Sequence, residues 1–222
     1  AVRLDTGASA ALWNLALVLE QSGEQEEAEK TYAKVVEKDP ENSEARFRLG
    51  YVWLQRGDYR GSAEAFEACL KKRKDWTEAQ MNLALAYWKL GDRDLAQLVY
   101  EQALGADPKS LDALRGLAAL ALERGDFESS LEYHGRLVDL GERTPELLYN
   151  TGLLLQKSGQ AEEAARLYRE ALAENPDFAE ALLNLGHVMK LLGQEEEARV
   201  CWGKALEAKP ELAKGYFEPV QS

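Results

Sequence analysis

Few side chains in this 222-residue chain have chemistry suited to a catalytic or metal site. The two cysteines are Cys69 and Cys201, and the two histidines are His134 and His187. A zinc site needs several thiolate or imidazole ligands at short spacings, whereas these four residues stand apart. No nucleophile elbow, phosphate-binding glycine loop or dinucleotide fingerprint occurs either. We therefore expect no metal, no cofactor and no catalytic activity.

His134 is the residue most open to a functional interpretation, because histidine titrates near neutral pH and can act as an acid, a base or a pH sensor. No carboxylate or thiol recurs at a helical spacing from it, as a catalytic pair would require. The favoured interpretation is that His134 replaces an aromatic residue of the core.

The elements that position these residues repeat along the chain. Glycines stand at Gly23, Gly57, Gly91, Gly125, Gly159 and Gly193, and each successive difference (57 − 23, 91 − 57 and so on) is 34. Six glycine corners with one period predict an array of two-helix units that share one narrow core.

Two positions in each unit hold small residues, where two helix backbones are expected to approach closely. The first position is Ala16, Gly50, Ala84, Ala118, Gly152 and Gly186, and the second is Ala28, Ser62, Ala96, Ser130, Ala164 and Ala198. Bulky residues between them should fill the core: Leu15, Leu49, Leu83, Leu117 and Leu185, with Tyr32, Phe66, Tyr100, Tyr168 and Trp202.

Both cysteines are predicted to be buried thiols. Cys69 takes the place of Ala103, Ala171 and Ala205 in other units, which favours a small core residue. Cys201 lies four units further on, and helices stacked about 8–10 Å apart would hold the two sulfurs too far apart for a disulfide.

The pattern of each unit resembles the tetratricopeptide repeat (TPR). The third unit carries it at Leu83, Ala84, Tyr87, Ala96, Tyr100, Ala103 and Pro108. This resemblance implies an all-α fold, a right-handed α-solenoid of helix-turn-helix repeats. The repeats are placed at 9–42, 43–76, 77–110, 111–144, 145–178 and 179–212. Residues 1–8 are expected to be a leader or a cloning remnant, and residues 213–222 a partial cap in which Tyr216 and Phe217 cover part of the last repeat.

Helix ends are marked by local signals. Pro40 ends a second helix because proline cannot continue it. Thr144 before Pro145 suits an N-cap followed by a first-turn proline. The spacing of Thr77 and Gln80 predicts a capping box.

The net charge of −12 and the pI near 4.8 argue against a general nucleic-acid or anionic-membrane binder. No run of eighteen apolar residues predicts a membrane span, so direct membrane insertion is not expected. The compartment stays open, with the cytoplasm slightly favoured.

The resemblance further implies that the first helices line a concave, ligand-binding face. Its apolar rows are read as Trp13, Phe47, Met81, Arg115, Tyr149 and Leu183; then Leu17, Tyr51, Leu85, Ala119, Leu153 and His187; then Leu54, Trp88 and Leu122. These rows point away from the small core positions, so their apolarity is not expected to be needed for helix stacking. An exposed apolar strip of this kind usually marks an interaction site.

Between the rows lie Asn14, Asn82, Asn150 and Asn184, with Arg48 and Gly116 at the two remaining places. An amide offers a donor and an acceptor, which suits the backbone of an extended peptide. A similar asparagine ladder lines the TPR domain of O-linked N-acetylglucosamine transferases. The alternative, that asparagine is simply common there in TPR repeats, stays open.

An acidic row, Glu44, Glu78, Asp112, Glu146 and Glu180, begins the first helices. Interaction with the helix dipole accounts for it, and selection for a basic peptide is the second interpretation. The TPR clamp for C-terminal carboxylates needs Lys, Asn and Arg on this face. Here Trp13, Leu17, Asp112 and Gly116 stand in those places, so chaperone tails are not expected to bind.

Together these observations predict a non-catalytic protein-interaction scaffold that holds a peptide or a partner helix in its concave groove. Two alternatives remain. The chain could be the regulatory or substrate-selecting TPR segment of a larger enzyme, such as a glycosyltransferase, or a scaffold that self-assembles weakly through uncapped terminal repeats.

Overall fold

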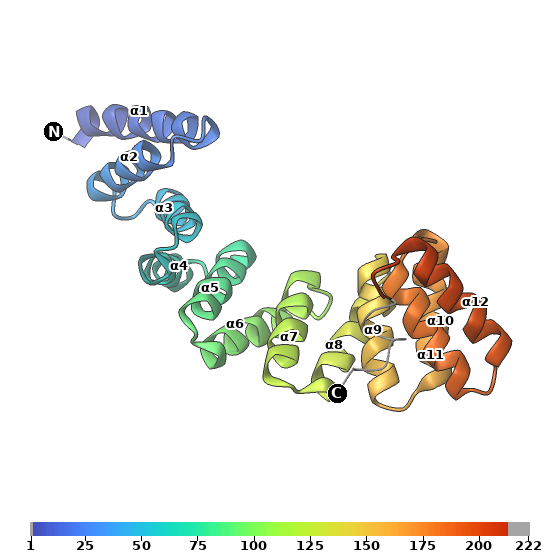
Figure 1. Ribbon diagram of the computed structural model, residues 1–222. Helices are drawn as coiled ribbons and strands as arrows, with labels where there is room; N and C mark the ends of the chain where they lie inside the picture. Colours follow the sequence, from blue (N-terminus) through green and yellow to red (C-terminus); the bar gives the residue numbers. More distant parts are fainter. Residues whose placement is uncertain (1, 213–222) are drawn as a thin grey trace, which may run out of the picture. The chain divides into compact units, whose positions relative to one another are not determined.

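The computed structural model describes residues 2–212, with side chains from residue 8 onward. These residues form twelve α-helices and no strand (Figure 1). The helices are α1 (Val2–Gln21), α2 (Gln25–Lys38), α3 (Ser43–Arg56), α4 (Tyr59–Lys72), α5 (Thr77–Leu90), α6 (Arg93–Ala106), α7 (Leu111–Arg124), α8 (Phe127–Asp139), α9 (Pro145–Lys157), α10 (Ala161–Glu174), α11 (Ala179–Leu191) and α12 (Glu195–Ala208). The all-α prediction is confirmed. The expected cap at 213–222, with Tyr216 and Phe217, lies outside the described residues.

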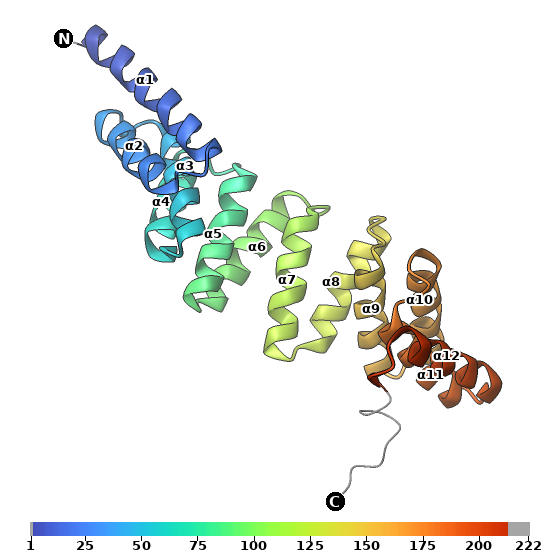
Figure 2. The ribbon, with the colours of Figure 1, turned by 45° about the horizontal axis from the view of Figure 1, so that its top comes forward.

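The chain divides into two compact units, residues 1–116 and 117–222, and the boundary falls within α7. In the first unit each helix from α1 to α6 contacts the next one along the chain. In the second unit α8 to α12 do the same, which the hairpins in Figure 2 make visible. The first helices of neighbouring repeats also touch, α3 with α5 and α9 with α11.

The corner glycines end the first helices in the left-handed conformation that other residues avoid. All six have φ between 75° and 88°. At Gly57 the backbone N–H donates to the Leu54 carbonyl, and the N–H of Asp58 donates to the Trp53 carbonyl at 2.9 Å. These bonds satisfy carbonyls that the end of a helix leaves unpaired. Gly141 (φ 92°) makes a further left-handed turn after α8, which the period did not predict.

The small positions are buried in every repeat, as predicted. Gly152 shows why they must be small. A Cβ atom there would lie 2.7 Å from Cε1 of Tyr168, a fully buried ring. The second helix therefore packs directly on the backbone of the first.

The first repeat departs from the pattern at Leu15. The period predicted a core residue, yet the Leu15 side chain is 50% exposed, while its equivalent Leu49 is 4% exposed. Leu49 packs against Ala28 and Tyr32 of the preceding second helix, and no described helix precedes α1. Residues 2–8, expected to be a leader, are helical and continue α1, which is 20 residues long.

The cap predictions had mixed outcomes. The Thr144 side chain accepts a hydrogen bond from the Leu147 N–H at 3.3 Å, as an N-cap should. The capping box at Thr77 is wrong, because the N-cap of α5 is Trp76 and no side chain caps it. The Gln80 side chain instead donates to the Lys74 carbonyl at 2.9 Å.

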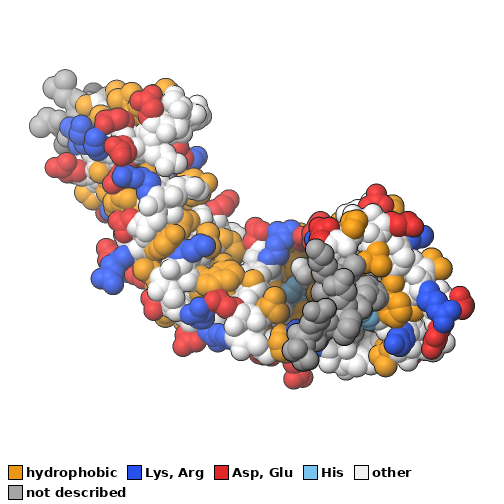
Figure 3. Space-filling model, viewed as in Figure 1, with side chains coloured by type: hydrophobic (Ala, Val, Ile, Leu, Met, Phe, Trp, Pro, Cys, Tyr) orange, Lys and Arg blue, Asp and Glu red, His pale blue; other side chains and the backbone are white. Residues whose placement is uncertain are grey.

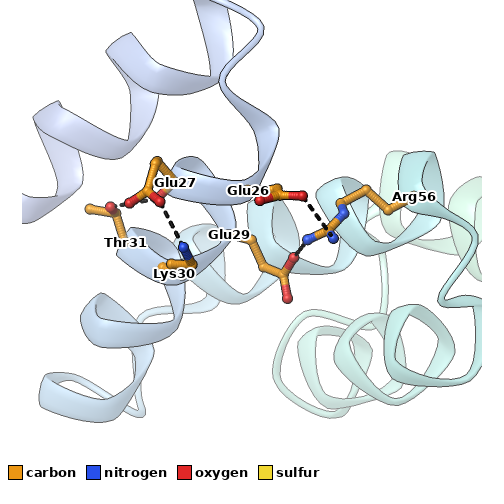
Figure 4. Close-up of polar contacts among 6 residues, drawn as sticks. All are labelled: Glu26, Glu27, Glu29, Lys30, Thr31 and Arg56. Atoms are coloured by element: carbon orange, nitrogen blue, oxygen red, sulfur yellow. Dashed lines mark hydrogen bonds and ion pairs between the residues drawn. The ribbon is translucent and has the colours of Figure 1, made fainter.

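Polar contacts add ties between neighbouring helices. Figure 4 shows Arg56 of α3 reaching Glu29 and Glu26 of α2. Trp53 of α3 also donates its indole N–H to Glu29 at 3.0 Å. Exposed ion pairs contribute only about 0–1 kcal/mol each, so the apolar contacts dominate the repeat interface.

Both cysteines are free and buried, as predicted. None of the helices in the described part of the chain is long and apolar enough to cross a membrane.

Candidate functional site

The first unit brings much of the predicted face together on α1, α3 and α5. Its half-buried members are Trp13, Leu17, Phe47, Arg48, Tyr51, Met81, Asn82, Leu85 and Trp88, and Asn14 is exposed. We call these ten residues the first-helix surface. In Figure 3, hydrophobic side chains reach the molecular surface among charged ones over the α4 to α6 region. Leu54 does not belong to the surface, because its side chain is only 8% exposed.

Two aromatic members of the predicted rows in this unit also pack against the core. Phe47 lies with its ring centroid 5.4 Å from that of Phe66 and 4.6 Å from that of Trp76, on which it stacks. Trp13 meets Tyr32 edge-on at 5.8 Å. The prediction that these apolar residues are not needed for packing is therefore wrong for Trp13 and Phe47, which present only one side to solvent.

Tyr51 and Leu85 differ from Trp13 and Phe47, whose rings pack against aromatic residues of the core. Both are half-buried, and they lie on α3 and α5, which touch. Within the described residues Tyr51 makes no hydrogen bond or ring contact, so its hydroxyl and ring are available to another molecule. Trp88 lies one helical turn after Leu85 and is half-buried as well. We take Tyr51, Leu85 and Trp88 as the candidate apolar anchors of the first-helix surface.

The asparagine row is oriented by its own helices. The amide nitrogen of Asn82 donates to the Glu78 carbonyl four residues back at 2.9 Å. Asn184 does the same with Glu180 at 2.9 Å. Asn82 therefore keeps one amide N–H and its side-chain carbonyl for a ligand, because an amide carries two N–H donors. Asn184 uses its amide nitrogen twice, toward Glu180 and toward Tyr149, so it offers mainly an acceptor.

Arg48 stands in the asparagine row but serves a structural contact. Its guanidinium donates to Glu20 of α1 at 3.3 Å, and Glu20 also accepts a hydrogen bond from the Tyr32 hydroxyl. Arg115 on α7 is exposed and pairs with Asp112 at 2.7 Å. At Gly116 a Cβ would lie 2.4 Å from the Tyr100 ring, so the missing side chain makes room for that ring.

A cavity of about 490 Å³ opens beside Trp13, lined also by Ser9, Ala10, Asp39, Asn42 and Glu44. Glu44 pairs with Arg73 at 2.8 Å, and Arg73 lies over the Trp76 ring at 4.1 Å. Trp13 and the carboxylates of Asp39 and Glu44 therefore line this cavity, and Glu44 is already paired with Arg73.

The second unit places the remaining predicted residues differently. Leu122 is 47% exposed, Asn150 is exposed, and Tyr149, Leu153, Asn184 and His187 are half-buried. Leu183 is a correction, because its side chain is only 1% exposed and packs in a cluster with Leu182 and Ala205. Tyr149 touches the rings of Tyr168 at 5.9 Å and Phe178 at 4.9 Å, so the packing prediction is wrong for it too.

His187 lies edge-on to the Trp202 ring at 5.6 Å. Burial lowers its pKa, and the nearby charge of Lys190 lowers the pKa further. Asn184 also donates to the Tyr149 hydroxyl at 3.2 Å, which joins α11 to α9. In this unit the predicted row is therefore more strongly tied into the packing than in the first unit.

Three carboxylates of the acidic row make ion pairs that sequence reasoning missed. Asp112 pairs with Arg115 on its own helix, and the other two pair with a cation at the end of the same repeat. Glu44 pairs with Arg73, and Glu180 pairs with Lys209 at 2.7 Å, and both partners lie 29 residues along the chain. The sequence did contain a signal for these pairs, because the cations Arg73 and Lys209 stand at the same position of their repeats, 43–76 and 179–212. Charge pairing with the end of the same repeat thus explains part of this row, in addition to the helix dipole.

The groups that could do chemistry are held in unreactive states. Burial raises the pKa of the Cys69 thiol to about 11, and its sulfur donates to the Ser43 carbonyl at 3.4 Å. Burial also raises the pKa of Cys201. His134 is buried at the place of a core aromatic, its pKa is lowered by burial, and its Nδ1 lies 2.8 Å from the Ser130 carbonyl oxygen. No group of three metal-ligating side chains occurs within residues 8–212.

Comparison with known proteins identifies the repeat. Two family models described as tetratricopeptide repeats match the chain. One matches residues 1–42, 15–79 and 81–142, and the other matches residues 155–214. A search of curated proteins gave no match.

Solved structures with the same fold include the MamA protein, with 22% sequence identity and a TM-score of 0.67 over 82% of this chain and 99% of that one. YrrB, described as a TPR protein with an unusual peptide-binding site, has 19% identity and a TM-score of 0.69 over 81% and 93%. PilF of Pseudomonas aeruginosa has 18% identity and a TM-score of 0.69 over 93% and 94%.

Proposed function

Because the chain belongs to the tetratricopeptide-repeat family, we propose that it is a non-catalytic interaction scaffold that binds an extended peptide segment of a partner protein on its first-helix surface. The observation that carries this proposal is the pair of half-buried residues Tyr51 and Leu85 on α3 and α5, which touch, with the half-buried Asn82 three residues before Leu85. YrrB, which shares the fold, is described as having a peptide-binding site.

The surface favours a ligand with particular chemistry. Asn82 and Asn184 each donate one amide N–H within their own helix, so their side-chain carbonyls would accept backbone N–H groups of an extended chain, and the second N–H of Asn82 would donate to a backbone carbonyl. The cavity beside Trp13, with Asp39 and Glu44, would take a lysine or arginine side chain. The net charge of −12 would speed the approach of a basic partner.

A binding role without catalysis fits the reactive groups. Both thiols have raised pKa values and are buried, so neither supplies the thiolate that nucleophilic catalysis needs. Both histidines have lowered pKa values with burial as the first cause.

The proposal is tested with an array of extended 12-residue peptides of varied charge, followed by titration of the tightest binder. Replacing Tyr51→Ala and Trp88→Ala together removes two half-buried anchors that lie outside the small core positions. Each buried large apolar side chain contributes roughly 1.5–3 kcal/mol, so the double variant should bind at least about 100-fold more weakly. Asn82→Ala should cost less, about 0.5–1.5 kcal/mol.

The matched control is Tyr59→Ala with Phe127→Ala, two partly exposed aromatic residues on the second helices α4 and α8. It should leave the peptide affinity unchanged. If Tyr51→Ala with Trp88→Ala stays helical and binds with the original affinity, the ligand binds elsewhere and the proposal fails.

A further inference from the structure

The outer face of α1 is apolar and exposed, unlike the same face of every later first helix. It consists of Ala8, Ala11, Leu15 and Val18, of which Leu15 is 50% and Val18 58% exposed. In the later repeats the positions equivalent to Leu15 and Val18 are all buried. These residues are Leu49, Val52, Leu83, Ala86, Leu117, Leu120, Thr151, Leu154, Leu185 and Val188.

Within each unit the preceding second helix packs against the later first helices α3, α5, α9 and α11. Leu49 and Val52 of α3, for example, cluster with Ala28 and Tyr32 of α2. The α1 outer face is therefore one half of this repeat interface, and no helix within the described residues covers it.

The composition of α1 suits burial against another helix. The stretch from Ala8 to Leu19 contains no charged residue, whereas α3 carries Glu44, Arg46, Arg48 and Arg56. The four outer residues follow one another at spacings of three, four and three, which is the seam spacing of a two-helix coiled coil. Depletion of charge is also typical of the core of a protein interface.

We propose that a second copy of this chain covers the α1 outer face, with the two α1 helices antiparallel about a twofold axis near residue 13. This axis places Ala11 opposite Leu15 of the second copy and Ala8 opposite Val18 of the second copy. Each large side chain then meets a small one, so the face is complementary to itself, as a twofold interface requires. Leu17 of the first-helix surface lies outside this seam and stays accessible, whereas Asn14, next to Leu15, flanks the seam.

The seam is short, so the dimer is weak. Three turns of helix bury much less than the roughly 800 Å² per partner of a standard interface. We expect a reversible dimer with a Kd on the order of 10–1000 μM.

Sedimentation velocity over a concentration series from about 10 μM to 1 mM tests the surface. The unaltered chain should show a sedimentation coefficient that rises with concentration. Leu15→Glu with Val18→Glu should remain monomeric throughout. The control is Leu98→Glu with Val200→Glu, because Leu98 (49% exposed) and Val200 (56%) match the seam pair in type and exposure. The proposal is overturned if the unaltered chain is monomeric at 1 mM, or if the control abolishes association equally.

Disulfide trapping tests the antiparallel geometry. An Ala11→Cys protein mixed with a Leu15→Cys protein should form a covalent heterodimer under mild oxidation, and native Cys69 and Cys201 should not react because they are buried. Val18→Cys alone should not link to itself, because the axis separates the two copies of residue 18 by about ten residues' rise, roughly 15 Å. Self-linking of Val18→Cys, or no linking between Ala11→Cys and Leu15→Cys, overturns the arrangement.

Discussion

Repeat 2 (43–76) and repeat 5 (145–178) build the same three-ring contact from different residues. In repeat 2, Phe47 touches Phe66 and Trp76 at centroid distances of 5.4 and 4.6 Å. In repeat 5, Tyr149 touches Tyr168 and Phe178 at 5.9 and 4.9 Å. The repeat preserves the positions of the rings although each of them changes type.

The polar contacts around these rings differ completely. In repeat 2 the guanidinium of Arg73 covers Trp76 and pairs with Glu44. In repeat 5 the Tyr168 hydroxyl donates to Gln156 at 2.8 Å, and the Tyr149 hydroxyl accepts from Asn184. These two repeats therefore share the positions of their rings and differ in the polar groups around them.

The largest expected effect comes from the third ring of the contact, which is buried to different extents in the two repeats. Trp76 is 7% exposed and Phe178 is half-buried, so truncating Trp76 leaves the larger cavity. Trp76→Ala should lower the free energy of unfolding by about 3–5 kcal/mol. Phe178→Ala should cost about 1–2 kcal/mol less, since the half-buried ring loses less burial. Urea unfolding followed by circular dichroism measures both, and equal losses would show that the rings are not distinguished by burial.

A smaller effect tests the close approach on which the ring contact depends. Gly152→Ala places a Cβ 2.7 Å from the Tyr168 ring, which cannot retreat freely because its hydroxyl is bonded to Gln156. Overpacking of this kind typically costs about 1–3 kcal/mol.

Gly203→Ala on α12 is the matched control for Gly152→Ala, because nothing lies within 4 Å of the added Cβ. It should stabilise the chain by about 0.5–1 kcal/mol through helix propensity. Changes of the same sign in the two variants would contradict the packing argument. Thermal unfolding of the two proteins side by side gives the comparison.

The smallest effect concerns His134, which takes the ring position that Phe66 and Tyr168 hold in the two compared repeats. Burial lowers its pKa from 6.5, so the folded chain binds this proton less readily than the unfolded chain. The free energy of unfolding must then fall as the pH drops below about 6.5. His134→Phe should reduce this loss, while His187, whose pKa is also lowered, should keep part of it. A pH series of urea titrations from 8 to 5 is the measurement, and an unchanged pH slope would contradict the prediction.

Periodicity predicted the fold well because the same packing constraint acts on the same positions of every repeat. Six glycine corners and two small positions per repeat were enough to locate the helices and their close approach. The same reasoning failed at Leu15, since a period treats every copy alike and cannot show that no helix within the described residues covers the first copy. It also missed Trp76, which falls outside the repeat motif and yet supplies the third ring by stacking on Phe47.

The candidate site was predicted less completely, because helical periodicity gives the direction of a side chain and not the depth of its neighbours. Leu54 and Leu183 point as the rows require, but adjacent helices bury them. Leu85 remains half-buried, and nothing in its residue type distinguishes it from the two buried leucines. The orientation of the Asn82 amide depends on the Glu78 carbonyl one turn back, a contact that residue types alone do not reveal.

The contacts of each helix with its immediate neighbours in sequence have a kinetic consequence. Contacts such as α2 with α3 and α11 with α12 close only short loops of chain, so folding loses little loop entropy before contacts form. Refolding should therefore be fast, and it can begin in more than one repeat. Amide hydrogens should exchange in blocks of about one repeat, rather than all at the rate of one global opening.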